Sequence, residues 1–312
     1  MHSDKKTEIP NLPARWGHDF SLTACLLVTG EDALAFIQGQ FTQELRSPVP
    51  HLAAYGLWLN QKGKVLADSF VLRENPQRLW VMSFTSPAAV IRERMEAYII
   101  ADDVVIEDVT MEWGGLAFGG AEAPVWFGEQ AEGSILPGPG EFVRLGEGFV
   151  FRGRRGTVES WEWLRPAAAA APTGLAALPA EALERMRIAA RIPSIPADIG
   201  PGDLPNEAGL ENDAISYTKG CYLGQEVMAR LKAMGQLRRR LVRVAASAGP
   251  VPAVPCALLQ GETRVGELRS AVEDGTGGFI GLALVTLLRL DAAAPLAPEP
   301  GGGAYIHPID TP

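Results

Sequence analysis

The chain has 312 residues, a formal net charge of −9 at pH 7, 47% hydrophobic residues and 21% charged residues. This length predicts two or three domains, because one hydrophobic core seldom serves more than about 250–300 residues. The acidic balance disfavours binding to nucleic acid or to anionic membranes, since both need a basic surface. We therefore expect neither nucleic acid nor a membrane as a direct partner.

The cysteines and histidines indicate the redox compartment and whether a metal site is expected. The three cysteines are odd in number and far apart, which argues against a disulfide framework and fits a reducing compartment. The four histidines never fall at metal-ligand spacing, so no structural metal site is expected. No apolar run follows the opening charges, and none later approaches the ~20 residues that cross a bilayer. A soluble, unexported, cytoplasmic protein is predicted.

The first half of the chain mixes strand, helix and hairpin patterns. FSLTACLLVTG (20–30) predicts a strand, and apolar residues at 34, 37, 41 and 45 predict a helix after it. YGLWLNQKGKVLADSFVL (55–72) predicts a hairpin around 60–63, and RLWVMSF (78–84) predicts another strand. Ser86 would then cap a helix that starts at Pro87, and DDVVIEDV (102–109) would return as a strand. This mixture favours the α+β class.

The second half begins with an uncertain stretch at 112–160, where glycines and tryptophans separate short β-like runs. PAAAAAPTG (166–174) is typical of a surface connection. LPAEALERMRIAARIP (178–193) predicts a helix that Pro193 stops. From about 237 onward, short strands separated by glycine and proline turns predict a small β-barrel.

The stretch TKGCYLGQEVMAR (218–230) contains the strongest candidate site. Apolar residues at 223, 227, 231 and 234 predict a helix that begins near 223 or 224, so Cys221 would lie beside its N-terminus. The helix dipole and the positive charge of Lys219 would lower the pKa of the thiol. Gly220 and Gly224 would let another backbone or a ligand approach. A buried, unreactive cysteine is the alternative interpretation, and both stay open.

Other candidates give weaker signals. No histidine lies near Cys221 in the sequence, so a Cys-His hydrolase has little support. GGLAFGG (114–120) lacks the context of a phosphate-binding loop and is more typical of a turn. The arginines of LRRRL (237–241) are typical of a solvated face. Acidic residues before Cys221 either line a cavity or keep a loop soluble; they are Asp198, Asp203, Glu207, Glu211 and Asp213.

KGCYLGQE (219–226), followed by VMARL, resembles the signature of the YgfZ family, folate-binding relatives of the glycine-cleavage T-protein that serve iron–sulfur protein maturation. The order of VTGEDALAFIQGQFTQEL, LNQKGKVLADSFVL, RMRIAARIPSIPADIGPGDLPNEAGL and GELRS agrees with it. The resemblance spans most of 18–290 and is poorest at 112–180. It implies a three-domain cloverleaf around a folate-sized central cavity.

In that arrangement, 18–110 and 175–235 form two interwoven folate-binding α+β domains. Residues 111–174 complete the middle domain and add a linker, and 236–308 form a C-terminal β-barrel. The T-protein relation makes tetrahydrofolate, or a derivative, the implied cofactor.

The resemblance also implies site residues. Glu207, in LPNEAGL, matches a glutamate that binds the pterin in T-protein relatives, where a carboxylate can accept paired N–H donors. Arg187 and Asp198 match an arginine and an acidic residue that precede it. Asp68 matches the second of two aspartates in aminomethyltransferases, whereas Ala67 stands at the first. The expected folate-binding set also includes Tyr222, Gln225 and Glu226, and the expected catalytic pair is Cys221 and Lys219.

The resemblance therefore implies a tetrahydrofolate-binding accessory factor that assembles or repairs iron–sulfur clusters in client enzymes, some of which modify tRNA. Folate and iron–sulfur client or assembly proteins would be its partners. Cys221 would be the essential thiol, although a cluster generally needs four ligands, so a partner or a small thiol would supply the others. Two alternatives stay open: a tetrahydrofolate-dependent aminomethyl or methyl transferase, and a noncatalytic scaffold in which Cys221 only packs.

Overall fold

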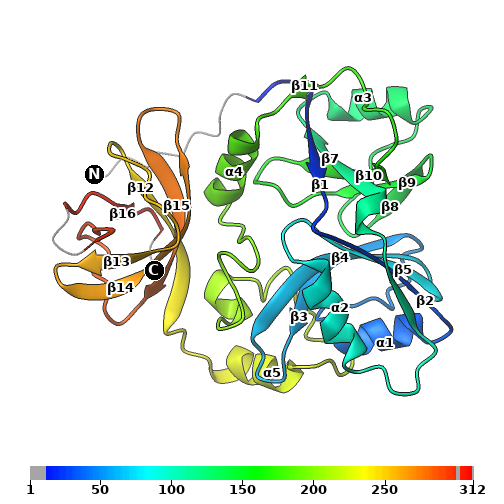
Figure 1. The fold of residues 1–312 in the computed structure, drawn as a ribbon, viewed down its shortest axis with the longest axis horizontal. Helices are drawn as coiled ribbons and strands as arrows, with labels where there is room; N and C mark the ends of the chain where they lie inside the picture. Colours follow the sequence, from blue (N-terminus) through cyan, green and yellow to red (C-terminus); the bar gives the residue numbers. More distant parts are fainter. Residues whose placement is uncertain (1–11, 300–302, 311–312) are drawn as a thin grey trace.

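The computed structural model describes residues 12–299 and 303–310, and it contains three β-sheets (Figure 1). Residues 1–11, on which the expectation of an unexported chain partly rests, lie outside the described part. Within the described ranges, no helix is both long enough and apolar enough to span a bilayer. Strands and helices alternate irregularly along the chain, so the predicted α+β class is confirmed.

The first sheet has the strand order β11-β1-β7-β10-β9-β8, and its neighbours are antiparallel except for β1 and β11. Its strands are β1 (Trp16–Ser21), β7 (Trp113–Gly119), β8 (Phe142–Leu145), β9 (Gly148–Arg152), β10 (Ser160–Pro166) and β11 (Ala176–Ala177). The 3-10 helix η1 (Thr110–Glu112) leads into β7. Helix α3 (Ala123–Gln130), which the sequence patterns missed, buries Trp126 and Phe127 beside Phe118 of β7.

The second sheet is antiparallel, with the order β3-β4-β5-β2-β6. Its strands are β2 (Ala24–Thr29), β3 (Leu52–Leu59), β4 (Val65–Asn75), β5 (Arg78–Ser83) and β6 (Val105–Asp108). Helices α1 (Ala33–Gln40) and α2 (Ala88–Glu96) cover one face, where Ile37 and Ile91 are fully buried. The other face packs against the first sheet, for example Trp80 against Phe149.

These two sheets are interwoven because the chain builds the second between two strands of the first. The predicted strand at 20–30 is wrong in one respect, since it breaks between Ser21 and Ala24. Its first two residues end β1, which pairs with β7. Residues 24–29 form β2, which pairs with β5 and β6. Five of the six residues of β2 are buried, whereas β1 alternates in burial toward its end, so the two halves suit different positions.

The third sheet is an antiparallel, curled half-barrel with the order β13-β14-β15-β12-β16, at the left of Figure 1. Its strands are β12 (Arg239–Ala246), β13 (Cys256–Gln260), β14 (Thr263–Glu273), β15 (Phe279–Thr286) and β16 (His307–Pro308). Register shifts between Leu258 and Leu259 and between Leu268 and Ser270 interrupt the ladders. Such bulges increase local bending and twist, which is how a short sheet curls.

Helix α4 (Ala180–Ala189) lies between the first sheet and the half-barrel (Figure 1). Its Leu183 and Met186 pack with Trp16 of β1, and the helix also contacts β14 and β15. It ends four residues before Pro193, earlier than predicted. The 3-10 helix η2 (Pro205–Ala208) and helix α5 (Gln225–Met234) follow before β12.

Two local predictions had different outcomes. The hairpin around 60–63 is confirmed, with Gly63 in the left-handed region at φ +68°. The cap of α2 is wrong, because Pro87 is the N-cap residue and Ser86 makes no capping hydrogen bond. The Ser86 hydroxyl instead bonds the Asp68 carboxylate and the Ile195 carbonyl, contacts that only the folded chain provides.

Candidate functional site

The loop at 218–224, here called the cysteine loop, is held by Lys219. Lys219 is 6% exposed, and its ammonium donates hydrogen bonds to the carbonyls of Gln38, Phe41 and Gln43, at 2.8, 2.7 and 2.8 Å. Two of these carbonyls lie at or next to the C-terminal end of α1, where the helix dipole favours a cation. Burial lowers the pKa of Lys219 to about 8. Lys219 therefore anchors the cysteine loop to α1.

The other side of the cysteine loop rests on the tip of the β3–β4 hairpin. Gly224 is the N-cap of α5 at φ +87°, and an added Cβ there would lie 3.0 Å from the Asn60 carbonyl oxygen. Only glycine adopts this conformation easily in so little space, so the predicted close approach of another backbone is confirmed for Gly224. A Cβ at Gly220 would meet nothing within 4 Å. That side of the cysteine loop is open.

Cys221 is exposed between two buried neighbours, Lys219 and Tyr222. The predicted helix start is confirmed, since α5 begins at Gln225 and Cys221 precedes its N-cap by three residues. The Gln225 side chain accepts a hydrogen bond from the Tyr222 amide at 3.3 Å, and Glu226 is exposed. By contrast Cys25 is buried, and burial raises the pKa of its thiol to about 12. Among the described residues, Cys221 thus presents the one exposed thiol, on an anchored loop.

A central cavity of about 190 Å³ lies where α4 meets the first two sheets. Asp68 of β4 lines it and is 9% exposed. Its carboxylate accepts hydrogen bonds from the hydroxyls of Tyr55, Ser83 and Ser86 at 2.9, 3.1 and 2.7 Å. Burial raises the pKa of Asp68, and these three donors limit the rise because they stabilise the charged form.

A second hollow, of about 750 Å³, shares Tyr55, Phe70 and Arg154 with the central cavity. The guanidinium of Arg154 lies 4.5 Å from the Tyr55 ring centroid and pairs with Asp213 at 2.9 Å. In the central cavity, the guanidinium of Arg155 lies 4.4 and 4.0 Å from the ring centroids of Phe20 and Phe84. The two hollows together combine a buried carboxylate, aromatic rings and guanidinium groups.

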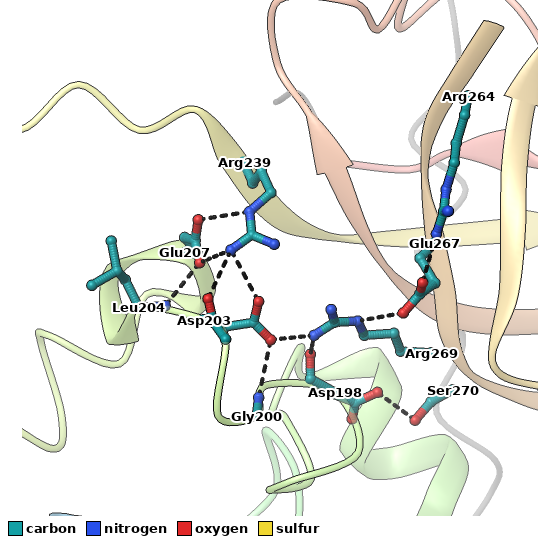
Figure 2. Close-up of polar contacts among 11 residues, drawn as sticks. Asp198, Gly200, Asp203, Leu204, Glu207, Arg239, Arg264, Glu267, Arg269 and Ser270 are labelled. Carbon is teal, nitrogen blue, oxygen red and sulfur yellow. Dashed lines mark hydrogen bonds and ion pairs between the residues drawn. The ribbon is translucent and has the colours of Figure 1, made fainter. Parts of the chain in front are cut away.

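Arg187 also lines the central cavity, but its donors are engaged by the protein. It bonds Asp198 at 2.6 Å, the Ile192 carbonyl at 2.7 Å, and Glu184. Asp198 has no exposed surface and also accepts hydrogen bonds from the Ser194 amide and, as Figure 2 shows, the Ser270 hydroxyl of β14. Asp198 therefore joins α4 to the half-barrel.

A second set of ion pairs joins η2 to the half-barrel (Figure 2). Arg239 of β12 pairs with both carboxylate oxygens of Glu207 at 2.9 and 2.8 Å and with Asp203 at 3.0 Å. Arg269 of β14 also bonds Asp203, and the Leu204 amide donates to Glu207 at 2.8 Å. The prediction that the arginines at 238–240 form a solvated face is therefore wrong for Arg239, because the fold brings two carboxylates to it.

The structure thus separates the expected site residues into three groups. Asp68 and Arg187 line the central cavity. Asp198 does not line it but accepts a hydrogen bond from Arg187. Glu207 does not line that cavity and holds Arg239. The third group lies on and beside the cysteine loop: Lys219, Cys221, Tyr222, Gln225 and Glu226.

Sequence patterns missed Tyr55, Arg154 and Arg155. The hairpin register could have indicated Tyr55, because β3 residues 55 and 57 pair with β4 residues 70 and 68, which makes Tyr55 a diagonal neighbour of Asp68. The two arginines follow β9 in a stretch without clear periodicity, so they gave no comparable signal. Among the described residues, no three His, Cys, Asp or Glu side chains gather to hold a metal ion.

Comparisons with known proteins match both ends of the chain. The GCVT N-terminal domain model matches residues 17–130, and the CAF17 C-terminal beta-barrel domain model matches 238–308. The human "Iron-sulfur cluster assembly factor IBA57, mitochondrial" is 28% identical, over 83% of this chain and 74% of the relative. The "tRNA-modifying protein YgfZ" of Colwellia psychrerythraea strain 34H is 24% identical, over 77% and 74%.

A solved structure agrees with the fold. The glycine cleavage system aminomethyltransferase T of Bartonella henselae aligns over 96% of this chain and 85% of its own, with a TM-score of 0.79 and 15% identity. At that identity the likeness shows the fold alone. The expected T-protein-like arrangement, with interwoven α+β units and a C-terminal barrel domain, is confirmed, and the described C-terminal sheet is a curled half-barrel.

Proposed function

Because this chain belongs to the YgfZ-type family, we propose that it is a tetrahydrofolate-binding factor for the assembly or repair of iron–sulfur clusters, with Cys221 as its working thiol. The names of the IBA57 and YgfZ relatives support the iron–sulfur and tRNA-modification parts. We propose the cytoplasm as its location and tRNA-modifying enzymes among its clients. The exposure of Cys221 on a loop anchored at both sides carries the proposal for the thiol.

The cluster itself would be cargo, shared between this protein and another. Clusters are generally held by four ligands, and the other cysteines lie elsewhere, Cys25 buried in β2 and Cys256 partly buried at the start of β13. An exposed thiol next to the open side of Gly220 can reach a partner's ligands or a small thiol without rearrangement of the fold. Cys221 would therefore supply one ligand, or exchange it, during transfer.

The central cavity and the second hollow fit tetrahydrofolate in their chemistry. Asp68 presents a buried carboxylate suited to N–H donors on a pterin edge, and Tyr55 and Phe70 provide ring faces. Arg154 supplies a guanidinium suited to the carboxylates of the tail. When bound, tetrahydrofolate supplies a carrier for a one-carbon unit. Each of these residues would bind or orient it.

The remaining members of the folate set would act from further away. We propose that the hydrogen bond between Arg187 of α4 and Asp198 holds the cavity wall that α4 forms in place. Glu207 would contact a pterin only by exchanging its pairing with Arg239. Tyr222, Gln225 and Glu226 would hold the cysteine loop and the start of α5, which links the thiol to the folate-binding part of the chain.

The thiol proposal is tested in a strain that lacks this gene and carries wild type, Cys221→Ala or Cys256→Ala at equal abundance. Iron–sulfur enzyme activity and tRNA thiomethylation are the readouts. We expect wild type and Cys256→Ala to restore both, and Cys221→Ala to restore neither. Equal rescue by Cys221→Ala would contradict the thiol proposal and favour a scaffold in which Cys221 only packs. No defect in the deletion strain would contradict the iron–sulfur role.

The folate proposal is tested by titrating purified protein with tetrahydrofolate in a calorimeter. Asp68→Asn and Arg154→Met should each weaken binding about tenfold, which equals roughly 1.4 kcal/mol and is the scale of one charge-assisted hydrogen bond. Arg264→Met, a substitution on the exposed side of β14, serves as the control and should leave binding unchanged. Binding that neither cavity substitution alters would place the folate elsewhere.

A folate-dependent aminomethyl or methyl transferase is the second candidate, and Asp68 on the cavity wall favours it. The assay is turnover of tetrahydrofolate with a methylamine donor. Turnover lost in Asp68→Asn and kept in Cys221→Ala would support the transferase. If wild-type protein binds tetrahydrofolate but shows no turnover with the methylamine donor, transferase activity with that donor is excluded. The accessory-factor proposal would then stand.

A further inference from the structure

A third pocket, of about 450 Å³, lies between the segment 206–217 and helix α5. It shares no lining residue with the two hollows around Asp68. Its walls combine apolar and polar side chains: Asn206, Glu211, Asn212, Ile215, Tyr217, Leu231, Lys232 and Leu237, with Gly235. Its volume is within the range of small-molecule sites.

Three lining side chains each carry a buried polar atom that makes no hydrogen bond of ordinary length and angle within the described structure. These atoms are Oδ1 of Asn206, Oε2 of Glu211 and the hydroxyl oxygen of Tyr217, and the Asn206 and Tyr217 side chains lie close enough to interact with each other. Asn206 is only 9% exposed. A buried polar atom without a partner is destabilising, and native proteins contain few such atoms. Their gathering in one pocket indicates a site for polar groups supplied from outside the chain.

The pocket also holds opposite charges that do not neutralise each other. Lys232 of α5 places its ammonium 3.9 Å from the Tyr217 ring centroid and makes no hydrogen bond or ion pair in the described structure. Among the described residues Glu211 forms no ion pair within 4.0 Å, so the ammonium and this carboxylate are farther apart than that, although the more distant charges of Arg240 and Arg191 also act on Glu211. A ligand that reached both would need a cationic group and an anionic group.

A ligand with a single charge can pair with only one of the two charged side chains, Lys232 or Glu211. A simple anion would suit Lys232 and the Tyr217 hydroxyl but would be repelled by Glu211, and a simple cation would meet the reverse problem. Water can bond the three atoms but brings no countercharge. Apolar walls from Ile215, Leu231 and Leu237 would pack against the carbon atoms between two charged ends.

We propose that this pocket binds a short zwitterionic peptide. Its ammonium would donate to the carboxylate of Glu211 and to Oδ1 of Asn206. Its carboxylate would accept from the ammonium of Lys232 and from the Tyr217 hydroxyl. Such a ligand would tie the segment before the cysteine loop to the helix after it. The proposal does not rest on the folate or iron–sulfur roles.

The test is calorimetric titration of the full chain with triglycine as the probe. We expect saturable binding of one triglycine per protein. N-acetyl-triglycine and triglycine amide, which each lack one charged end, should bind at least about tenfold more weakly, since each loses a charge-assisted contact. Glu211→Gln and Lys232→Met should weaken binding of triglycine to a similar degree. Glu262→Gln, on the exposed turn between β13 and β14, is the matched control.

Several outcomes would overturn the proposal. One is a lack of saturable binding by wild type, and another is equal binding of the free and end-blocked peptides. A third is unchanged affinity in Glu211→Gln and Lys232→Met when both variants keep the wild-type circular dichroism spectrum. Binding of inorganic phosphate alone that depends on Lys232 but not on Glu211 would make this an anion site instead.

Discussion

The cysteine loop at 218–224 and the segment 198–207 both carry several charged or reactive side chains. They differ in whether those side chains are buried and hydrogen-bonded or exposed to solvent. In the segment, the carboxylates of Asp198, Asp203 and Glu207 are buried, and each accepts a hydrogen bond from an arginine. Figure 2 shows these contacts for Asp203 and Glu207. In the cysteine loop, Lys219 is similarly engaged but the adjacent thiol of Cys221 has been left exposed.

The difference separates residues that hold the molecule together from one that is available to react. A buried charge with a complete set of partners has no capacity left for a ligand unless a contact is exchanged. An exposed group on an anchored backbone can still bind or react with a ligand, and its position is fixed. Graded substitutions across the two regions can test this distinction.

The largest loss of stability is expected for Asp198→Ala. It would leave Arg187 buried with one partner fewer and the Ser194 amide and Ser270 hydroxyl without their acceptor, and breaking such a buried pair typically costs about 3–5 kcal/mol. Urea unfolding measures the change. Arg264→Ala, on the exposed Arg264–Glu267 pair of β14, is the control and should change the unfolding free energy by less than about 0.5 kcal/mol. Equal effects would show that the segment is not a structural joint.

Lys219→Met should have an intermediate effect of about 2 kcal/mol, because three buried carbonyls lose a charged donor while the cost of burying the charge is relieved. Amide hydrogen exchange should also speed up at 218–224. Lys62→Met, on the exposed tip of the β3–β4 hairpin, is the control. Unchanged exchange in the cysteine loop of Lys219→Met would refute the anchoring role.

A smaller, pH-dependent effect is expected at Asp203. Burial acts to raise the pKa of this carboxyl, but hydrogen bonds from Arg269 and the Gly200 amide, with the charges of Arg269 and Arg239, lower it overall. Because the native pKa is below the unfolded one of about 4, its stabilisation is present above that pH and is lost as pH falls through the native value.

Acid unfolding followed by circular dichroism measures this contribution. Asp203→Asn should be less stable than wild type at neutral pH, and its stability should fall less steeply below about pH 4. Asp102→Asn, at an exposed position before β6, should keep the wild-type pH profile. A wild-type profile in Asp203→Asn would mean that this carboxyl does not contribute to acid sensitivity.

The smallest change in stability is expected for Cys221→Ala, below about 0.5 kcal/mol, because an exposed side chain has little packing to lose. In native wild-type protein, iodoacetamide should modify Cys221 first and Cys25 only after unfolding. A large destabilisation, or simultaneous alkylation of both thiols, would remove the contrast between the two regions.

Local patterns predicted those features that depend on neighbours in the sequence. The hairpin around 60–63 and the start of α5 near residue 224 follow from alternation, helical spacing and glycine, and both are confirmed. Helix α3 was missed because Trp126 and Phe127 are buried against β7 in a stretch whose own periodicity is weak. Ser86 was misassigned because its partner, Asp68, belongs to another strand.

Sequence patterns were enough to predict the α+β class, the short strands of the C-terminal part and the position of Cys221 before a helix, and the resemblance pointed to Asp68 and Arg187. Only the folded chain shows that Lys219 anchors a loop, that Arg239 meets Glu207 and Asp203, and that Tyr55 and Arg154 join Asp68 around a cavity. The reason is separation along the chain. Helix and strand patterns arise from contacts a few residues apart, whereas each of these partners comes from a segment that only folding brings near.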